Sequence, residues 1–299
     1  MVNRNCPLFL GIDGGGSKCR AILVDEQGQL LGSGLGGAAN PLRGIDTTIA
    51  SIMDATHQAL QNASLQPTQL KHVTAGIGLA GVNIPSMHQK VAAWQHPFRA
   101  LHLTSDLDIA CIAAHGQANG AVVIVGTGSC GLALSANGRT EIGGHGFLLG
   151  DKGSGAWFGN QAMRRVLEAS DGLAESTLLT DAVLQQARCK TPLELVEKYS
   201  NALPKVIAQF APVVFAMAAK NDAAAINLVL EGKSYIEKIC QQLLDQQPGR
   251  LSLVGGLTPL ISQWISPDIR QHIAPALQAP EWGAIHFARH QKQRVLETT

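Results

Sequence analysis

The sequence predicts an α/β fold made of two similar units. Three expected strands open the chain and are followed by alternating helices and strands, in the order βββαβαβα. An apolar strand, a glycine-rich turn and a second strand then occur twice, at residues 8–25 and 121–134. A repeat of this kind, although weak, is what a duplicated domain leaves behind. The length of 299 residues is enough for two domains or for one large domain.

Apolar runs and turn residues place the individual elements. Strands are expected at residues 7–12, 20–25, 72–79, 101–104, 121–125, 131–134 and 251–254, and residues 28–36 are expected to form a turn followed by a further strand. Helices are expected at residues 45–60, 85–94, 107–115 and 282–295. A mostly helical stretch at 156–247 is broken near Pro192, Pro204 and Pro212.

Composition excludes several classes of protein. Hydrophobic residues make up 45% of the chain and the formal net charge is +1, so we expect a globular protein with no nucleic-acid partner. The sequence has no signal-peptide pattern and no apolar run long enough for a bilayer, which predicts a cytoplasmic protein. The cysteines form no CxxC pair and no zinc-like cluster, which favours free thiols. They are Cys6, Cys19, Cys111, Cys130, Cys189 and Cys240.

The segment GIDGGGSK at residues 11–18 is a candidate phosphate loop. It is not a Walker A loop, because Ser17-Lys18 reverses the required order and a strand follows it, and it lacks the Rossmann glycine spacing. One interpretation is a hairpin turn without a ligand. The other assigns Asp13 to a hydrated Mg²⁺. The phosphate ligands would then be the N–H groups of Gly14, Gly15 and Gly16 and the side chains of Ser17 and Lys18.

Two further glycine turns support the second interpretation. Gly126-Thr127-Gly128-Ser129 lies at the equivalent place of the second unit, and Gly255-Gly256 follows the apolar strand LSLV. Two hairpins that face each other across a cleft would hold a triphosphate from both sides. The third turn would let an adenosine lie against the backbone.

In this order and spacing, the turns resemble the phosphate-1, phosphate-2 and adenosine motifs of the sugar kinase, actin and heat-shock ATPase superfamily. More narrowly, the chain resembles the BadF/BadG/BcrA/BcrD-type ATPase family and, within it, the N-acetylglucosamine kinases. The matching segments are GIDGGGSK (11–18), AANP (38–41), GIGLAG (76–81), TSDLDIA (104–110), GTGS (126–129), GGHGFLLGDKGSGAW (143–157), LVGGLTP (253–259) and GAIHFARH (283–290).

The resemblance implies two ribonuclease-H-like (actin-like ATPase) lobes, residues 1–117 and 118–299, with ATP, Mg²⁺ and sugar in a central cleft. It also implies closure on binding, a homodimer and a terminal helix that packs back on the first lobe. We place the hinge near residues 115–120.

Asp106 is the expected catalytic base. In the sugar kinases that the chain resembles, an aspartate at this position takes the proton of the attacking sugar hydroxyl, a role that requires a carboxylate within hydrogen-bond reach. The alternative is that Asp106 caps the following helix. We expect Asp108 to be the cap.

The same resemblance assigns further ligand-binding residues, and for Asn40 and Asp151 a purely structural role in a turn is the alternative. An amide such as Asn40 can both donate to and accept from a sugar hydroxyl. Thr127, Gly128 and Ser129 would serve phosphate or sugar hydroxyls. The segment that closes on the amino sugar contains Gly143, Gly144, His145, Gly146 and Asp151.

Four positions depart from the N-acetylglucosamine kinase pattern, all in the sugar half of the site. By our alignment they are Ala80 for Ser, Cys130 for Asn, His145 for Trp and Lys152 for Glu. His145 is either a surface loop residue or a weak stacking partner for the sugar ring. Phosphoryl transfer is therefore better supported than the identity of the acceptor.

The leading hypothesis is an ATP-dependent amino-sugar kinase that phosphorylates the 6-hydroxyl of N-acetylglucosamine, with glucosamine as the competing acceptor. A second hypothesis is an ATPase activator of a radical dehydratase, which would need closely spaced cysteines for an iron–sulfur cluster. A third is a sugar-sensing regulator. We disfavour it because the chain begins directly with the first strand and keeps Asp106.

Overall fold

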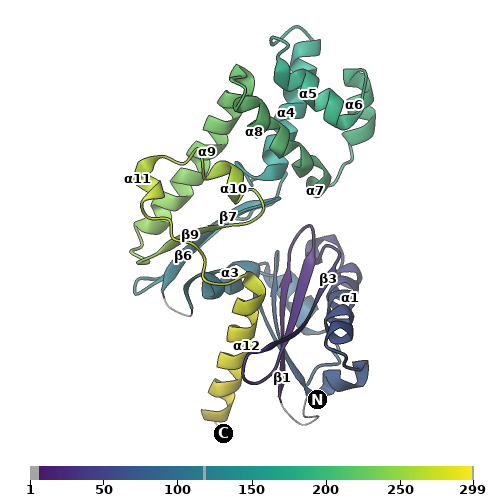
Figure 1. The fold of residues 1–299 in the computed structure, drawn as a ribbon, viewed down its shortest axis with the longest axis vertical. Coiled ribbons are helices and arrows are strands. Elements are labelled where there is room, and N and C mark those ends of the chain that lie inside the picture. The colour runs from purple at the N-terminus through teal and green to yellow at the C-terminus, as the bar shows by residue number, and fades with distance from the viewer. Residues whose placement is uncertain (1–6, 117–118, 298–299) are drawn as a thin grey trace. The chain divides into compact units, whose positions relative to one another are not determined.

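The computed structural model describes residues 7–116 and 119–297, with side chains as far as residue 291 (Figure 1). The chain forms two compact units, one made of residues 1–120 and 275–299 and the other of residues 121–274. The boundary expected between residues 117 and 118 lies outside the described residues, as does part of the expected hinge.

The first unit is built on a five-stranded sheet with the order β3-β2-β1-β4-β5. Its strands are β1 (Leu8–Gly14), β2 (Cys19–Val24), β3 (Leu30–Gly36), β4 (Val73–Leu79) and β5 (Ala100–Ser105). β1 pairs with β2 in antiparallel fashion and with β4 in parallel, and β4 and β5 are parallel. Gly14 is in register with Leu79, and Leu79 with Ser105, so the three parallel strands end side by side.

Strand alternation divides the core of this unit between the two faces of the sheet. Leu8, Leu10 and Ile12 belong to a cluster with residues of α1 (Ile45–Asn62). Phe9 lies in a separate cluster with Ile22 and Val24 and with residues of α12 (Pro280–Glu297). Because side chains two residues apart share a face, Gly11 and Asp13 lie on the same face as Phe9.

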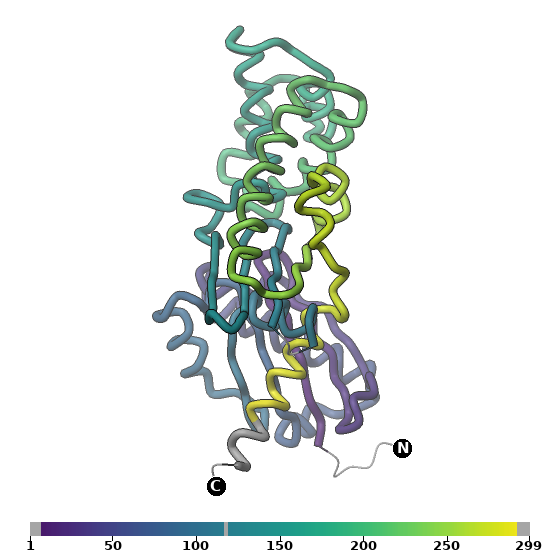
Figure 2. The backbone as a smooth tube through the Cα atoms, turned by 90° about the vertical axis from the view of Figure 1, so that its left-hand side faces the viewer, coloured from purple at the N-terminus to yellow at the C-terminus, as the bar shows by residue number. Residues whose placement is uncertain are grey.

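Glycines let α12 approach this second face at backbone distance. A Cβ atom at Gly11 or Gly76 would overlap the backbone carbonyl oxygen of Glu281 or Ala284 in α12, and one at Gly283 would overlap the backbone of α3 (Asp106–His115). The helix therefore packs against α3, β1 and β4 (Figures 1 and 2).

Arg289 joins α12 to the turn between β2 and β3. Its Nη2 donates to the carbonyl oxygens of Asp25 and Glu26 at 2.9 and 3.0 Å, and its guanidinium lies 4.8 Å from the ring centre of Phe9. These contacts join the last helix to the first residues of the sheet.

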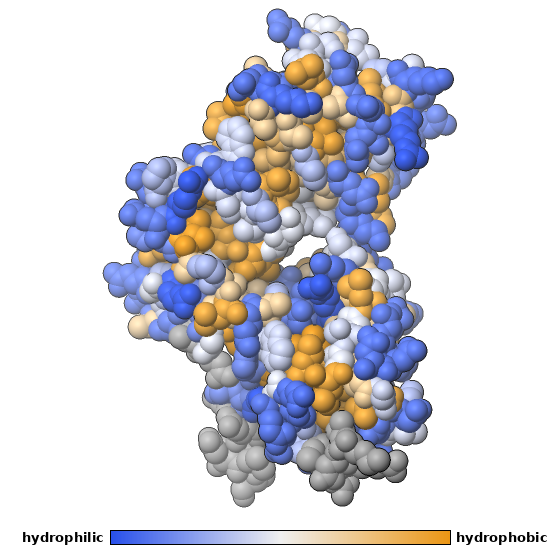
Figure 3. Space-filling model, viewed as in Figure 1, coloured by the Kyte–Doolittle hydropathy of each residue, from blue (hydrophilic) through white to orange (hydrophobic). Residues whose placement is uncertain are grey.

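The remaining elements of the first unit connect the strands. The short helix α2 (Pro85–Ala92) and the 3₁₀ helices η1 (Pro41–Arg43) and η2 (Pro67–His72) complete it. On the face of the molecule shown in Figure 3, hydrophilic residues interrupt the hydrophobic ones on the surface of both units.

The second unit repeats the strand order of the first with one strand fewer. Its sheet has the order β8-β7-β6-β9, which corresponds to β3-β2-β1-β4. Next to β9, the place of a fifth strand is reduced to a parallel bridge between Leu251 and Ile273. The strands are β6 (Gly120–Val125), β7 (Ser129–Ser135), β8 (Gly138–Gly143) and β9 (Leu251–Val254).

Helices make up most of the second unit, as the sequence predicted for residues 156–247. They are α4 (Gly155–Ser170), α5 (Leu178–Ala187), α6 (Pro192–Tyr199), α7 (Pro204–Ile207), η3 (Ala208–Phe210), α8 (Ala211–Ala218), α9 (Ala223–Leu244), α10 (Thr258–Ile261) and α11 (Pro267–Arg270). Pro192 and Pro204 each begin a helix, and Pro212 lies in the first turn of α8.

The sequence analysis missed β8. Its residues, GRTEIG, include a single large apolar side chain, and each of them is at least partly exposed. Such a segment carries no alternation signal, and its pairing with β7 becomes visible only in the folded sheet.

Other expectations can be compared with the described residues only. None of Cys19, Cys111, Cys130, Cys189 and Cys240 forms a disulfide within the described residues, and Cys6 lies outside the described part of the chain. Among residues 7–116 and 119–297, no single helix combines the length and the apolar character of a membrane span.

The glycine contacts of α12 predict a large effect of one methyl group. Gly76→Ala should lower the free energy of unfolding by at least about 2 kcal/mol, because the new Cβ meets rigid backbone at Ala284. Chemical denaturation measures this change. Gly16→Ala is the control, since no atom lies within 4 Å of that Cβ position, and it should change stability by less than about 1 kcal/mol. Equal stability of the two variants would contradict the packing described for α12.

Candidate functional site

In the first unit, candidate residues gather where the three parallel strands end. Asp13 is the penultimate residue of β1, and Asp106 directly follows β5. The two carboxylates interact electrostatically across the edge of the sheet. In open α/β sheets, the carboxyl ends of the strands are where ligands bind.

Asp106 is not the cap of α3. Ser105 is the N-cap, and its Oγ accepts a hydrogen bond from the N–H of Asp108 at 3.1 Å. The carboxylate of Asp108 accepts in return from Thr104 Oγ1 at 2.6 Å and from Ser105 Oγ at 2.8 Å, which completes a capping box. The expectation that Asp108 caps the helix was therefore close, but Ser105 holds the N-cap position. The alternative prediction that Asp106 is the N-cap is wrong, because Asp106 is the first residue within the helix.

The pKa of Asp13 is raised to about 7, first by burial and then by the negative charges of Asp106 and Glu281. The positive charges of Lys18 and Arg20 act in the opposite direction. A carboxylate in this position favours a nearby cation, because a cation offsets both the lost hydration and the neighbouring charges.

The three glycines of the candidate phosphate loop have different surroundings. Gly14 packs against Leu79, where a Cβ would overlap the side chain. The N–H of Gly15 donates to the carbonyl oxygen of Lys18 at 2.9 Å and closes the hairpin, so this amide does not point to a phosphate as expected. Gly16 has open space at its Cβ position, and Lys18 is exposed.

Asn40 lies beside the same edge of the sheet. The N–H of Ala39 donates to Gly15 O at 2.9 Å, which joins the AANP segment to the glycine loop. Asn40 Oδ1 accepts from Leu42 N at 3.0 Å and caps η1. The turn role considered for Asn40 is therefore present, and the Nδ2 atom is its group suited to donate to a sugar oxygen.

In the second unit, the GTGS turn is closed by its own backbone and by the start of α4. Gly126 N donates to Gly128 O at 2.9 Å, and the carbonyl oxygens of Gly126 and Thr127 accept from Gly155 and Ala156 at 2.8 and 3.2 Å. These bonds fix the turn against the N-terminus of a 16-residue helix. Helix N-termini carry positive partial charge, which suits a phosphate.

Ser129 is the first residue of β7 rather than part of an open turn. It is 1% exposed, and its Oγ donates to Lys152 O at 2.8 Å. This bond holds the 151–154 segment against the strand. The Ser129 hydroxyl therefore donates its proton to a hydrogen bond within the protein and not to a ligand.

Asp151 is a buried acid in a left-handed backbone conformation, with a φ of 57°. Burial raises the pKa of its carboxyl group, whereas hydrogen bonds from the backbone of Gly146 and Ser129 and the charge of His145 lower it. Its carboxylate also lies against Gly128, where a Cβ would meet Oδ2. The fold thus brings two of the candidate features, Asp151 and the GTGS turn, into contact.

The other candidate residues of this unit lie in loops. Gly144 and His145 are exposed, and Gly144 N donates to Ser129 O at 3.1 Å. Gly255, at a φ of 109°, packs against the backbone of Val125 at the end of β6, which only glycine allows. No atom lies within 4 Å of the Cβ position of Gly256.

Sequence reasoning missed Glu281. This residue lies in the first turn of α12, where an acidic residue is common for electrostatic reasons. Nothing in the sequence indicates that it is buried near Asp13, since the two residues are 268 positions apart. No sequence signal on its own would have identified it.

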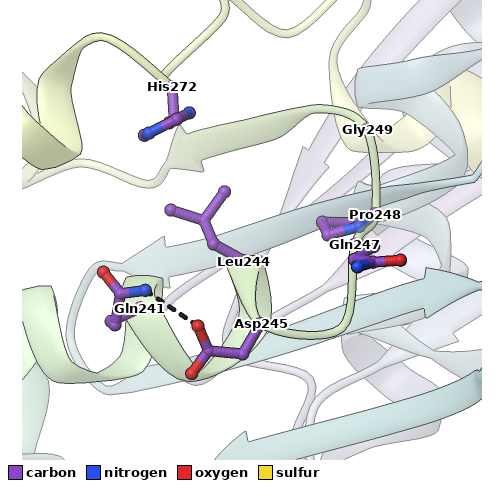
Figure 4. Close-up of a pocket in the computed structure, with 7 residues that line it drawn as sticks. All are labelled: Gln241, Leu244, Asp245, Gln247, Pro248, Gly249 and His272. Carbon is purple, nitrogen blue, oxygen red and sulfur yellow. Dashed lines mark hydrogen bonds between the residues drawn. The ribbon is translucent and has the colours of Figure 1, made fainter.

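A pocket of about 320 Å³ in the second unit is a different feature (Figure 4). It lies between the end of α9 and the segment before β9, and Gln241 Nε2 donates to Asp245 Oδ1 across its rim at 2.8 Å. It is therefore at the opposite end of β9 from Gly255. We do not assign the candidate chemistry to this pocket.

The acidic residues fit a hydrated cation better than a directly bound one. Within the described residues, no group of three or more His, Cys, Asp or Glu side chains is arranged to hold a metal ion directly. Mg²⁺ usually keeps several waters and takes one or two carboxylates together with phosphate oxygens. Asp13, an oxygen ligand near two further acidic groups, meets that requirement.

A family comparison decides the evolutionary relationship. The model of the BadF/BadG/BcrA/BcrD ATPase family matches residues 10–288. The chain belongs to this family. The match runs from β1 to α12, so both units of this ATPase-family protein are included.

Two relatives carry names that specify an activity. Glucosamine kinase GspK from Vibrio cholerae is 33% identical over 280 residues, which are 94% of this chain and 95% of that protein. N-acetyl-D-glucosamine kinase from Dictyostelium discoideum is 29% identical over 240 residues, 75% of this chain and 74% of that protein.

Solved structures share the fold of this family member. A proposed N-acetylglucosamine kinase from Chromobacterium violaceum has a TM-score of 0.88 at 29% identity, with 95% of this chain and 99% of that chain covered. A ROK family glucokinase from Streptomyces griseus has a TM-score of 0.53 at 16% identity, with 96% and 99% covered. The predicted α/β fold with two lobes is confirmed.

The raised pKa of Asp13 predicts a pH-dependent stability. The folded protein holds a proton at Asp13 up to about pH 7, whereas the unfolded chain releases it near pH 4. The free energy of unfolding should therefore fall as the pH rises between these values. Asp13→Asn removes this loss, so its stability relative to the wild type should be higher at pH 8 than at pH 4, by roughly 1.4 kcal/mol per unit of pKa shift.

Urea denaturation at both pH values, without nucleotide and with a chelator, measures this difference. Asp181→Asn, an exposed residue of α5, controls for the loss of one charge. A difference between Asp13→Asn and wild type that is the same at both pH values would contradict the raised pKa.

Proposed function

We propose that this protein is an ATP-dependent amino-sugar kinase. The observation that carries the proposal is the 33% identity to a glucosamine kinase over 94% of the chain. The local structure is consistent with it, because Asp106 lies at the carboxyl edge of the first sheet, where Ser105 holds the N-cap position and Asp106 Oδ1 accepts a hydrogen bond from Leu107 N at 3.0 Å.

In the proposed reaction, Asp106 accepts the proton of the attacking sugar hydroxyl. The hydroxyl oxygen forms a bond to the γ-phosphorus of ATP, and the bond from that phosphorus to the bridging oxygen breaks and releases ADP. Asn40 Nδ2 donates to a sugar oxygen and so helps to orient the acceptor.

The remaining candidate residues serve ATP. Asp13 would hold the hydration shell of a Mg²⁺ ion in the first unit, and that ion would supply positive charge to the phosphate oxygens. Lys18 and the backbone around Gly16 face the phosphates there. In the second unit, the GTGS turn at the start of α4 binds phosphate, and Gly255-Gly256 borders the adenosine.

Glucosamine is the acceptor that we place first and N-acetylglucosamine the second, which reverses the order of the sequence analysis. The relative named as a glucosamine kinase is more similar and covers more of the chain than the named N-acetyl-D-glucosamine kinase. The departures at Ala80, Cys130, His145 and Lys152 also affect the half of the site that would recognise an acetamide. Lys152 lies 2.8 Å from Glu231 and 5.8 Å from the ring centre of Trp157.

The dehydratase-activator alternative needs reactive thiolates. The pKa values of the Cys19 and Cys240 thiols are raised to about 12, first by burial and then by nearby acidic charges, and each thiol lies in the core of a different unit. Protonated core thiols are poor ligands for an iron–sulfur cluster. We therefore favour the kinase.

Substitution of Asp106 tests the proposed base. Asp106→Asn keeps the shape of the side chain and removes the proton acceptor, so kcat with glucosamine should fall by about 10²–10⁴-fold. ADP release is measured with ATP and Mg²⁺ against glucosamine, N-acetylglucosamine, N-acetylmannosamine, glucose and no sugar.

Asp108→Asn is the matched control for this experiment. It removes the capping-box carboxylate two residues away and should lower stability by about 1 kcal/mol while kcat stays within a few-fold of wild type. Preference for N-acetylglucosamine would keep the mechanism and change the acceptor. Sugar-independent ADP release, equal in wild type and Asp106→Asn, would refute the kinase.

A further inference from the structure

Glu281 lies on the same face of the first sheet as Asp13. The carbonyl oxygen of Glu281 is next to Gly11, and Gly11 and Asp13 point to the same side of β1. Arg20 stands directly opposite Asp13 in the β1–β2 pair, and its Nη1 is 3.8 Å from Glu281 Oε1. Arg20 is therefore a neighbour of both acids.

One oxygen of Glu281 lacks a hydrogen-bond partner. The Glu281 side chain is 9% exposed, and its Oε2 atom is buried without a hydrogen bond to any described group of the protein. Buried carboxylate oxygens are costly unless a donor satisfies them. The Oε2 atom of Glu281 is therefore suited to accept a hydrogen bond from a bound ligand or water molecule.

Structural roles do not account for this burial. An acid in the first turn of a helix is favourable, but an exposed side chain serves that purpose equally well. The ion pair with Arg20 is long, and the Arg20 side chain is 51% exposed, so the pair contributes little. Neither role requires Oε2 to point inward.

The surroundings of Glu281 select a cationic, proton-donating ligand. Asp13 and Glu281 interact electrostatically, and Asp13 also interacts with Asp106, so three acids act on one region. They are not arranged to bind a metal ion directly. Water molecules bound to Mg²⁺ combine positive charge with O–H donors, which is the chemistry that an unpaired carboxylate oxygen needs.

We propose that Glu281 is a positioning residue for the magnesium ion of the phosphate site, and that its Oε2 accepts a hydrogen bond from a metal-bound water. This inference rests on the proposed function, because that function brings Mg²⁺ to Asp13. Glu281 touches no reacting atom, and it orients the hydration shell that Asp13 also holds. The last helix of the chain thereby contributes to a site formed by the first strand.

The test measures the affinity of ADP by calorimetry with and without Mg²⁺ in the intact protein. In the wild type, Mg²⁺ should tighten ADP binding. In Glu281→Gln, the affinity of ADP without Mg²⁺ should stay unchanged. The gain from Mg²⁺, which is the factor by which Mg²⁺ increases the affinity of ADP, should fall about tenfold. This is the usual loss when a group that hydrogen-bonds to a metal ligand is removed. Melting temperatures verify that each variant folds. If Glu281→Gln does not fold, Glu281→Asp replaces it, since it keeps the charge and withdraws the oxygen by one methylene.

Arg20→Gln separates the metal role from the ion pair. It breaks the same ion pair but removes a positive charge, so the gain from Mg²⁺ should stay the same or increase. Equal weakening in Arg20→Gln and Glu281→Gln would assign Glu281 to the ion pair and overturn the inference. A full gain from Mg²⁺ in Glu281→Gln would overturn it as well.

A third variant distinguishes this inference from the proposed function. If Asp13→Asn loses the gain from Mg²⁺ while Glu281→Gln keeps it, only the role of Glu281 is refuted. If Mg²⁺ does not affect ADP binding to the wild type, both the inference and the magnesium site of the proposed function are refuted.

Discussion

The close approach of α12 to the first sheet is the constraint on which much of the first unit depends. Glycine at positions 11, 76 and 283 removes the side chains that would hold the helix away. The helix then covers the face that carries Phe9, Gly11 and Asp13, and Arg289 fastens it to the β2–β3 turn. This packing lowers the exposure of the strand end and brings a second acid beside Asp13, which explains why the pKa of Asp13 is raised.

The two units use the same strand order for different local chemistry. In the first unit, carboxylates lie at the edge where the strands end. Without a cation, burial and mutual repulsion disfavour their charged form, and the pKa of Asp13 is raised for this reason. In the second unit, the corresponding edge is closed by backbone hydrogen bonds between the GTGS turn and α4. One edge is therefore suited to a cation and a proton transfer, and the other to the oxygens of a phosphate group.

Much of the fold could be predicted from the sequence because its strong elements are local. The strands β1 and β6 are apolar runs and the helix α1 has a helical apolar pattern, and these signals can be read from the local sequence alone. The strand β8 could not be predicted, because its polar residues gain their conformation from pairing with β7. The exact start of α3 also differed, since the capping box of Ser105 and Asp108 places Asp106 inside the helix.

For the candidate site, motifs pointed to Asp13, Asp106 and Asp151, but they did not show which neighbouring groups contact these three residues. The hydrogen bond from Gly15 to Lys18 and the buried hydroxyl of Ser129 reduce the groups available to a ligand, and both depend on loop geometry that spacing does not reveal. Glu281 required the fold itself, since only the glycine contacts bring it to Asp13.

Phosphoryl transfer to an amino sugar is the central claim, and phosphorus NMR of a reaction with ATP, Mg²⁺ and glucosamine tests it most directly. The account predicts a sugar phosphomonoester signal that grows in step with ADP. ADP accompanied only by inorganic phosphate, with glucosamine and with N-acetylglucosamine alike, would contradict it.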